Sequence, residues 1–207
     1  MKCRGEETRR EIVQKNELRP IAHVRLLAGQ TKRSCTGDLL TDAYYCFSYE
    51  QCGGGTESGS FFCGEHAARH FLELLGVKPL PLFNPLSAAG VGVPGAVGGV
   101  AAAPQQRASW DPTAKQLYNA LNLLVVCWDS PPGPALANIK QKVERFGDRP
   151  PFLSQVKAVN TIISRDFKKR SLTEMIDELA TENKIKPYRF ELLNEVLEEA
   201  GIESKYG

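Results

Sequence analysis

An uncharged stretch in the middle of the chain constrains its folding more than any other feature. No residue between Pro79 and Gln106 carries a charge, and 86–103 consists largely of Ala, Gly and Val around Pro94. Although this stretch has nearly the length of a membrane span, glycine and proline disfavour a helix, and Ala and Gly add little transfer free energy. We therefore interpret 86–109 as a flexible Ala/Gly-rich linker between two folded parts.

Residues 1–85, before the linker, predict an α+β module of short strands and one helix. Three segments rich in aromatic or alternating apolar residues predict strands: 21–27, 42–50 and 60–63. The spacing of apolar residues then predicts a helix over 65–75, which Gly76 ends as a C-terminal cap.

Residues 110–207, after the linker, predict an all-helical domain. Asp111 and Pro112 form a typical helix start, and Ser171 with Glu174 forms a capping box. Apolar residues at helical spacing mark five amphipathic helices with short connections between them. We expect these helices to pack as a compact bundle.

Composition and charge restrict the class of protein. A hydrophobic fraction of 42% excludes wholesale disorder, and a net charge of +2 excludes a histone-like polycation, so any basic patch must be local. The N-terminal twenty residues are charged and lack the apolar core of a signal peptide. We expect an intracellular protein, cytoplasmic or, in a eukaryote, nuclear, with no membrane association, in which the six cysteines bind metal or do chemistry.

The cysteines and histidines of the N-terminal module form the main candidate site. They follow the spacing Cys46-x5-Cys52-x10-Cys63-x2-His66. Four such side chains at a hairpin and the start of a helix are the ligand types that zinc binds tetrahedrally. In general form the pattern is similar to treble-clef zinc modules, although its first spacing is wider than their tight knuckle. Cys35 and His70 are alternate ligands.

Two other interpretations use the same residues. In the first, Cys63 is a nucleophile before a helix, His66 is its base, and the Gly-rich segment 53–60 binds an anion or oxyanion through backbone N–H groups. In the second, Cys46 and its neighbours are inert core residues, and the protein is a metal-free structural adaptor.

A second candidate site is the charge pattern of the helical domain. Nine basic residues and only three acidic ones lie between Lys140 and Arg170, whereas the last helix is rich in glutamate. The residues that we predict to contact a partner are Lys157, Arg165, Lys168, Lys169 and Arg170. An ordinary solvated surface remains the alternative.

Together these patterns predict a zinc-stabilised binding protein rather than an enzyme. The metal would supply folding free energy to a small module, and the helical domain would dock a protein or a nucleic acid. No catalytic residue is assigned in this interpretation.

Overall fold

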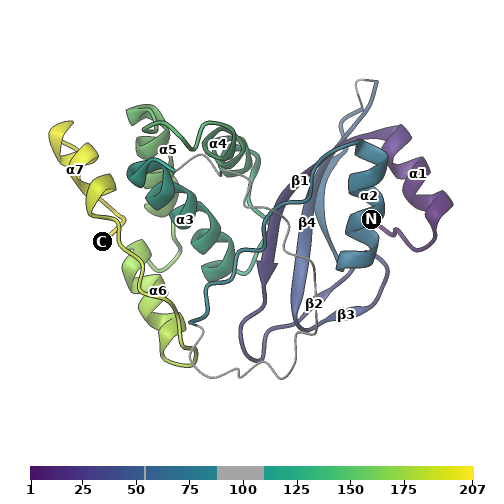
Figure 1. The fold of residues 1–207 in the computed structure, drawn as a ribbon, viewed down its shortest axis with the longest axis horizontal. Helices are drawn as coiled ribbons and strands as arrows, with labels where there is room; N and C mark the ends of the chain where they lie inside the picture. The colour runs from purple at the N-terminus through teal and green to yellow at the C-terminus, as the bar shows by residue number, and fades with distance from the viewer. Residues whose placement is uncertain (54, 88–109) are drawn as a thin grey trace, which may run out of the picture. The chain divides into compact units, whose positions relative to one another are not determined.

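The computed structural model describes residues 1–53, 55–87 and 110–207 (Figure 1). These residues divide into two compact units. The N-terminal unit contains 1–85 and 121–141, and the C-terminal unit contains 86–120 and 142–207. In this division 121–141 groups with the N-terminal module, whereas the sequence analysis placed it in the helical domain; the predicted domain boundaries stay a prediction.

In the N-terminal unit, residues 1–85 form an α+β module, as expected, with antiparallel strands and two helices where one was predicted. Its elements are α1 (Glu6–Lys15), β1 (Asn16–Arg25), β2 (Lys32–Arg33), β3 (Leu39–Leu40), β4 (Ala43–Gln51), β5 (Ser58–Cys63) and α2 (Glu65–Leu75). The main sheet has the order β1-β4-β5, and β2 pairs with β3 in a second, two-stranded sheet. The β1–β4 register shifts between Pro20 and Ala22, where proline has no N–H to donate.

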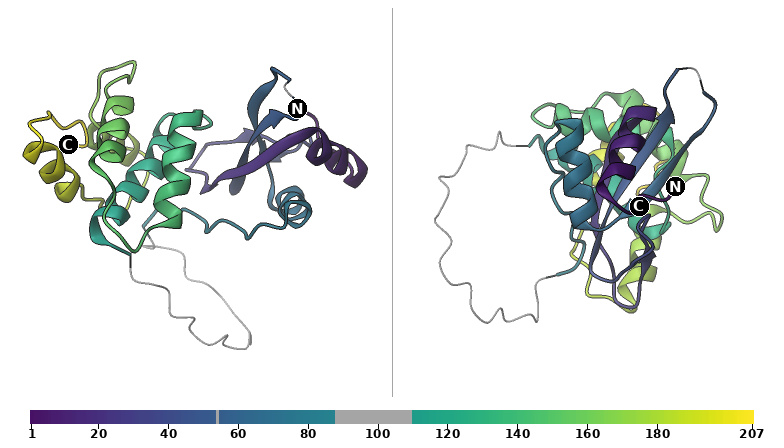
Figure 2. Two further views of the ribbon diagram at one scale, coloured as in Figure 1. Left: turned by 90° about the horizontal axis from the view of Figure 1, so that it is seen from above. Right: turned by 90° about the vertical axis from the view of Figure 1, so that its right-hand side faces the viewer.

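Strand alternation builds the core of this unit. Tyr45, Phe47, Phe61 and Cys63 project to the same face of the sheet and share a buried cluster with Ile12 of α1 and Phe71 of α2. Figures 1 and 2 show α1 and α2 side by side over this face. Gly76 ends α2 with φ of 64°, which explains why the predicted helix 65–75 has the observed bounds.

One ion pair links the segment 121–141 to the strands of the N-terminal module, and the part of α3 within this segment is largely buried. Leu121, Leu123, Leu124, Val125 and Val126 are all buried, so this part of α3 has no solvent-facing side. The buried Lys32 Nζ also lies 2.7 Å from Asp129 Oδ1, in the turn that follows α3. The one-sided apolar pattern that we used to assign this helix could not reveal a segment covered on every side.

Five helices lie in 110–207, in the segments where five were predicted. They are α3 (Pro112–Cys127), α4 (Pro134–Arg145), α5 (Leu153–Ile163), α6 (Leu172–Ala180) and α7 (Glu191–Glu199). Their packing as a single bundle stays a prediction. In the C-terminal unit, α5 packs against α7 through buried side chains such as Val156, Val159 and Leu193.

The last residues of the chain complete the core of the C-terminal unit. Tyr206 is fully buried, and its hydroxyl donates a hydrogen bond to the Val156 carbonyl at 2.9 Å. Asn160 of α5 donates to the Glu203 carbonyl and accepts from the Lys205 N–H. These bonds hold 203–206 against α5.

The predicted linker 86–109 lies outside the described residues except for Leu86 and Ser87. Leu86 forms a β-bridge with Ile185, and the Ser87 N–H donates to the Lys184 carbonyl at 2.7 Å. Among the helices of the described ranges, none combines the length and the apolar character that crossing a membrane requires.

Candidate functional site

The sheet register places two of the predicted zinc ligands on opposite faces. Tyr45 pairs with Cys63, and Cys46 pairs with Phe62. Because successive residues of a strand point to opposite faces, Cys63 faces α2 with Tyr45, whereas Cys46 faces away from α2. Both cysteines are fully buried. A single ion between them would have to lie within the sheet itself.

The other two predicted ligands lie elsewhere. Cys52 is exposed just beyond the end of β4, and its N–H donates to the Lys15 carbonyl. It is seven residues along from Tyr45, the partner of Cys63, which corresponds to about 23 Å of extended strand. His66 is exposed on α2. The structure therefore does not bring the four residues together, and in the part of the chain that it describes no group of three or more His, Cys, Asp or Glu side chains is placed to hold a metal.

The two alternate ligands have other partners. Cys35 forms a disulfide with Cys3, which the sequence reasoning missed because 32 positions separate them and no motif links them. The Cys35 N–H also donates to the Phe62 carbonyl at 2.7 Å. His70 Nδ1 accepts a hydrogen bond from the buried Arg9 Nε at 2.8 Å. The zinc centre stays a prediction that these positions do not support.

The alternative of a Cys63 nucleophile also lacks the geometry that it needs. Burial raises the pKa of the Cys63 thiol to about 12, although the nearby Arg9 guanidinium opposes that rise. A thiol with this pKa is protonated at neutral pH, whereas a nucleophilic cysteine must be a thiolate. Within the described residues, no hydrogen bond joins Cys63 to the exposed His66. In the predicted anion-binding segment 53–60, residues 58–60 belong to β5 and residue 54 is outside the description.

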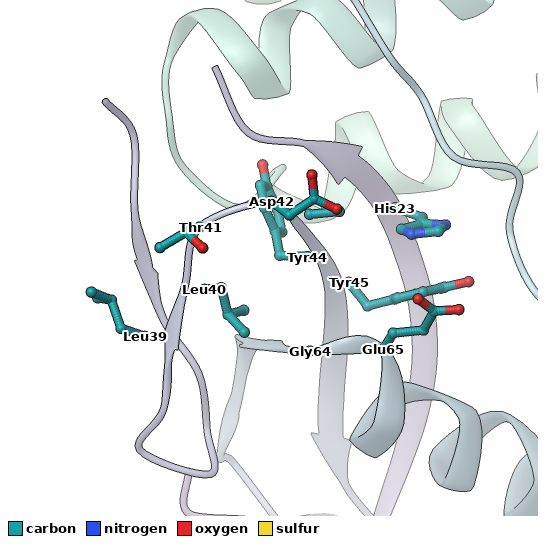
Figure 3. A pocket seen from close by; sticks show the side chains of 10 residues that line it. His23, Leu39, Leu40, Thr41, Asp42, Tyr44, Tyr45, Gly64 and Glu65 are labelled. Carbon is teal, nitrogen blue, oxygen red and sulfur yellow. The ribbon is translucent and has the colours of Figure 1, made fainter. Parts of the chain in front are cut away.

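A cavity of about 300 Å³ opens at the start of α2 (Figure 3). His23 of β1 stacks on Tyr45 with 3.9 Å between ring centroids, and Figure 3 shows the Tyr45 ring between His23 and Glu65. The Leu80 carbonyl lies 3.1 Å from His23 Nδ1 and accepts a hydrogen bond from the Tyr45 hydroxyl at 3.3 Å. The sequence analysis assigned neither His23 nor Tyr45 to a site, because they come from segments separated in the sequence.

The electrostatics of this cavity favour a neutral imidazole. Burial lowers the pKa of His23, against the opposing effects of the Leu80 carbonyl and the Glu65 carboxylate. A neutral ring that donates from Nδ1 to Leu80 leaves Nε2 as an acceptor. Asp42, also on the lining, is paired with Arg25 at 3.2 Å. The cavity thus offers mainly acceptor atoms to a small ligand.

The five basic residues predicted to contact a partner fall into two groups. Lys168 and Arg170 form ion pairs with Glu178, and Arg170 also pairs with Asp166 at 2.8 Å. The remaining three are exposed and form no ion pair within the described residues: Lys157, Arg165 and Lys169. The charges of these three side chains are therefore available to a negatively charged partner.

The turn that follows α5 has an internal framework. Asp166 is buried, and its Oδ2 accepts hydrogen bonds from the Lys168 N–H at 3.0 Å and the Arg170 N–H at 3.2 Å. The Arg170 guanidinium donates to both Asp166 oxygens. Between these anchored residues, the Phe167 side chain is 96% exposed. We call residues 166–170 the Phe167 turn.

Exposed side chains on α5 precede this turn in the chain. Leu153, Lys157 and Thr161 are exposed and fall within an arc of about 80° at 100° per residue. No acidic residue occurs from 149 to 165. We define the α5 surface as the exposed residues Phe152, Leu153, Lys157, Thr161, Arg165, Phe167 and Lys169. It combines cations with aromatic rings and contains no carboxylate.

Comparison with known proteins places the chain in a family. Residues 1–204 match the model of a family described as "Uncharacterised conserved protein UCP028583". The chain belongs to this family. No curated protein and no solved structure matches the chain. Its function therefore has to be argued from the residues described above.

Proposed function

We propose that the protein binds nucleic acid through the α5 surface of its C-terminal unit. The observation that carries this proposal is the exposed Phe167, held on an anchored turn beside cations that form no ion pair with any described residue. Free cations attract phosphates, and exposed rings offer faces to bases.

The charge distribution around α5 supports a polyanionic partner. Lys157 lies on the outward face of α5, Arg165 is exposed just beyond the end of the helix, and Lys169 follows on the Phe167 turn. The acidic α7 packs against the opposite, buried face of α5. A polyanion would thus meet attractive charge on the outward face, whereas an acid-rich surface elsewhere would repel it.

Salt dependence and charge reversal test the proposal. Binding of a fluorescein-labelled oligonucleotide is measured by anisotropy at 50 and 200 mM salt. If three cations contact phosphates, affinity should fall by about 20- to 40-fold over this range. The triple variant Lys157→Glu, Arg165→Glu, Lys169→Glu should abolish binding at both concentrations.

A matched control separates this surface from general charge. Lys2, Lys78 and Lys184 are exposed lysines outside the α5 surface, so their triple reversal changes net charge equally. The control variant should retain binding within about twofold. No binding by the wild-type protein, or equal loss in both triple variants, would overturn the proposal and direct attention to a protein partner.

The zinc staple of the predicted function is a separate question. It rests on the types of residue in the N-terminal unit and gains no support from the positions of Cys46, Cys52, Cys63 and His66. Metal quantification on purified wild type and on Cys63→Ser tests it directly, with about one zinc per chain expected if the staple exists.

A further inference from the structure

We infer that the α5 surface selects single-stranded nucleic acid, with Phe167 as a stacking platform for an unpaired base. This inference rests on the proposed function and names the form of nucleic acid that the same surface takes. It follows from how Phe167 is presented, from the second exposed ring on the surface, and from what a duplex can offer to such rings.

Phe167 is exposed on a turn whose backbone is held by hydrogen bonds. Its neighbour Asp166 is 3% exposed, and this buried carboxylate fixes the backbone on the C-terminal side of the ring through the N–H groups of Lys168 and Arg170. Lys169 adopts φ of 61°, a left-handed conformation that lysine rarely takes without such support. The turn therefore fixes the backbone from which the exposed ring projects, which reduces the backbone conformational entropy lost on binding.

A second ring lies at the other end of the same surface. Phe152 precedes α5 and is 77% exposed, whereas Phe167 follows α5. The eleven residues of α5 span about 16 Å, and Lys157 lies on the outward face between the rings. Rings at both ends with a cation between them match the arrangement by which single strands are bound, with bases on aromatic faces and phosphates on basic groups.

A duplex cannot use this arrangement fully. Its bases stack on one another inside the helix, so the exposed rings would meet phosphate and sugar instead of base faces. Only the cations would then contribute to affinity. An unpaired strand offers both its bases and its phosphates, whether it is RNA or DNA, and should therefore bind more tightly.

The experiment compares three forms of one oligonucleotide. Anisotropy at 50 mM salt is measured for a labelled single-stranded 12-mer of mixed sequence, for its duplex, and for an abasic 12-mer of equal charge, with RNA and DNA versions of the single strand. We expect the single strand to bind at least 10-fold more tightly than the duplex or the abasic strand.

Variants of the ring identify its role. Phe167→Ala should weaken binding of the single strand by about 5- to 150-fold while leaving the abasic strand unchanged. Phe167→Trp should retain tight binding because it keeps an aromatic face, whereas Phe167→Leu should behave like Phe167→Ala. Leu39→Ala removes an apolar side chain that is 62% exposed in the N-terminal unit and should have no effect.

The outcomes distinguish the two proposals. Equal binding of all three oligonucleotide forms, with unchanged affinity for Phe167→Ala but loss on triple charge reversal, would overturn the stacking inference and leave nucleic-acid binding standing. Absence of binding to every form would overturn both. Because Phe167 contributes almost nothing to the core, its variants should fold, and circular dichroism of each variant tests this.

Discussion

The two units use their distinctive side chains in opposite ways. In the N-terminal unit, Cys46, Cys63 and the Cys3–Cys35 disulfide are buried, and Arg9 is enclosed with them. In the C-terminal unit, the distinctive side chains are the exposed Phe167 and the exposed Lys157, which forms no ion pair in the part of the chain that the structure describes. Cysteine and arginine, which often form reactive or binding sites, are thus buried in the N-terminal unit. Phenylalanine, which usually packs in a core, is exposed to solvent in the C-terminal unit.

Replacing a phenylalanine by alanine in each unit should give the largest difference in the free energy of unfolding. Phe47→Ala removes a fully buried ring from the sheet core and should lower the free energy of unfolding by about 3–5 kcal/mol. Phe167→Ala removes a ring already in water and should change it by no more than about 0.5 kcal/mol. Urea unfolding followed by circular dichroism measures both, and similar losses would contradict the described exposure.

Thiol reactivity should separate the cysteines by at least about 100-fold in rate. Cys52 is exposed, whereas burial shields Cys46 and Cys63 and raises the pKa of each thiol. Iodoacetamide labelling near pH 7.5, followed by mass spectrometry, should modify Cys52 first. Labelling in urea is the control, since unfolding should equalise the rates. Rapid native labelling of Cys63 would revive the nucleophile interpretation.

Loss of the carboxylate that anchors the Phe167 turn should have an intermediate effect. Asp166→Ala leaves two backbone N–H groups and the Arg170 guanidinium without their acceptor, which should lower the free energy of unfolding by about 3 kcal/mol. It should also weaken oligonucleotide binding, because the backbone that carries the ring is no longer fixed. Lys168→Ala loses only an exposed ion pair and should cost less than about 1 kcal/mol in the same urea titration.

The pH dependence from His23 should be the smallest effect. Its pKa is lower in the folded protein than the ordinary value of 6.5, so the unfolded chain binds more protons at mildly acidic pH. Stability should therefore fall as pH drops from above 6.5 through the folded-state pKa. Unfolding midpoints at pH 7.5, 6.5 and 5.5 should show a smaller decline for His23→Gln, and the exposed His66→Gln should behave as wild type.

Local patterns in the sequence predicted local structure well. The helix 65–75 was predicted with its observed bounds because both signals are local in the sequence. The apolar spacing marks the helix itself, and Gly76 marks its C-terminal cap. The segments of β4 and β5 were recognisable from their aromatic residues. The strand β1 begins earlier than predicted, at Asn16 directly after α1, because its charged first residues hide the pattern.

Features that depend on distant contacts could not be predicted in the same way. Spacing alone did not reveal that Cys46 and Cys63 face opposite sides, since that follows from the register of β4 and β5. The Cys3–Cys35 bond and the pairing of Arg170 with Glu178 join residues that no motif connects. Phe167 was overlooked as a site residue because a phenylalanine in a sequence is normally assigned to a core.

The bond between Cys3 and Cys35 closes a covalent ring that contains all of α1, β1 and β2. A protease cut at a peptide bond between these two cysteines would not release a fragment, because both new ends would stay attached through sulfur. On a gel without reductant the nicked chain would remain one species, and only added thiol would separate its pieces.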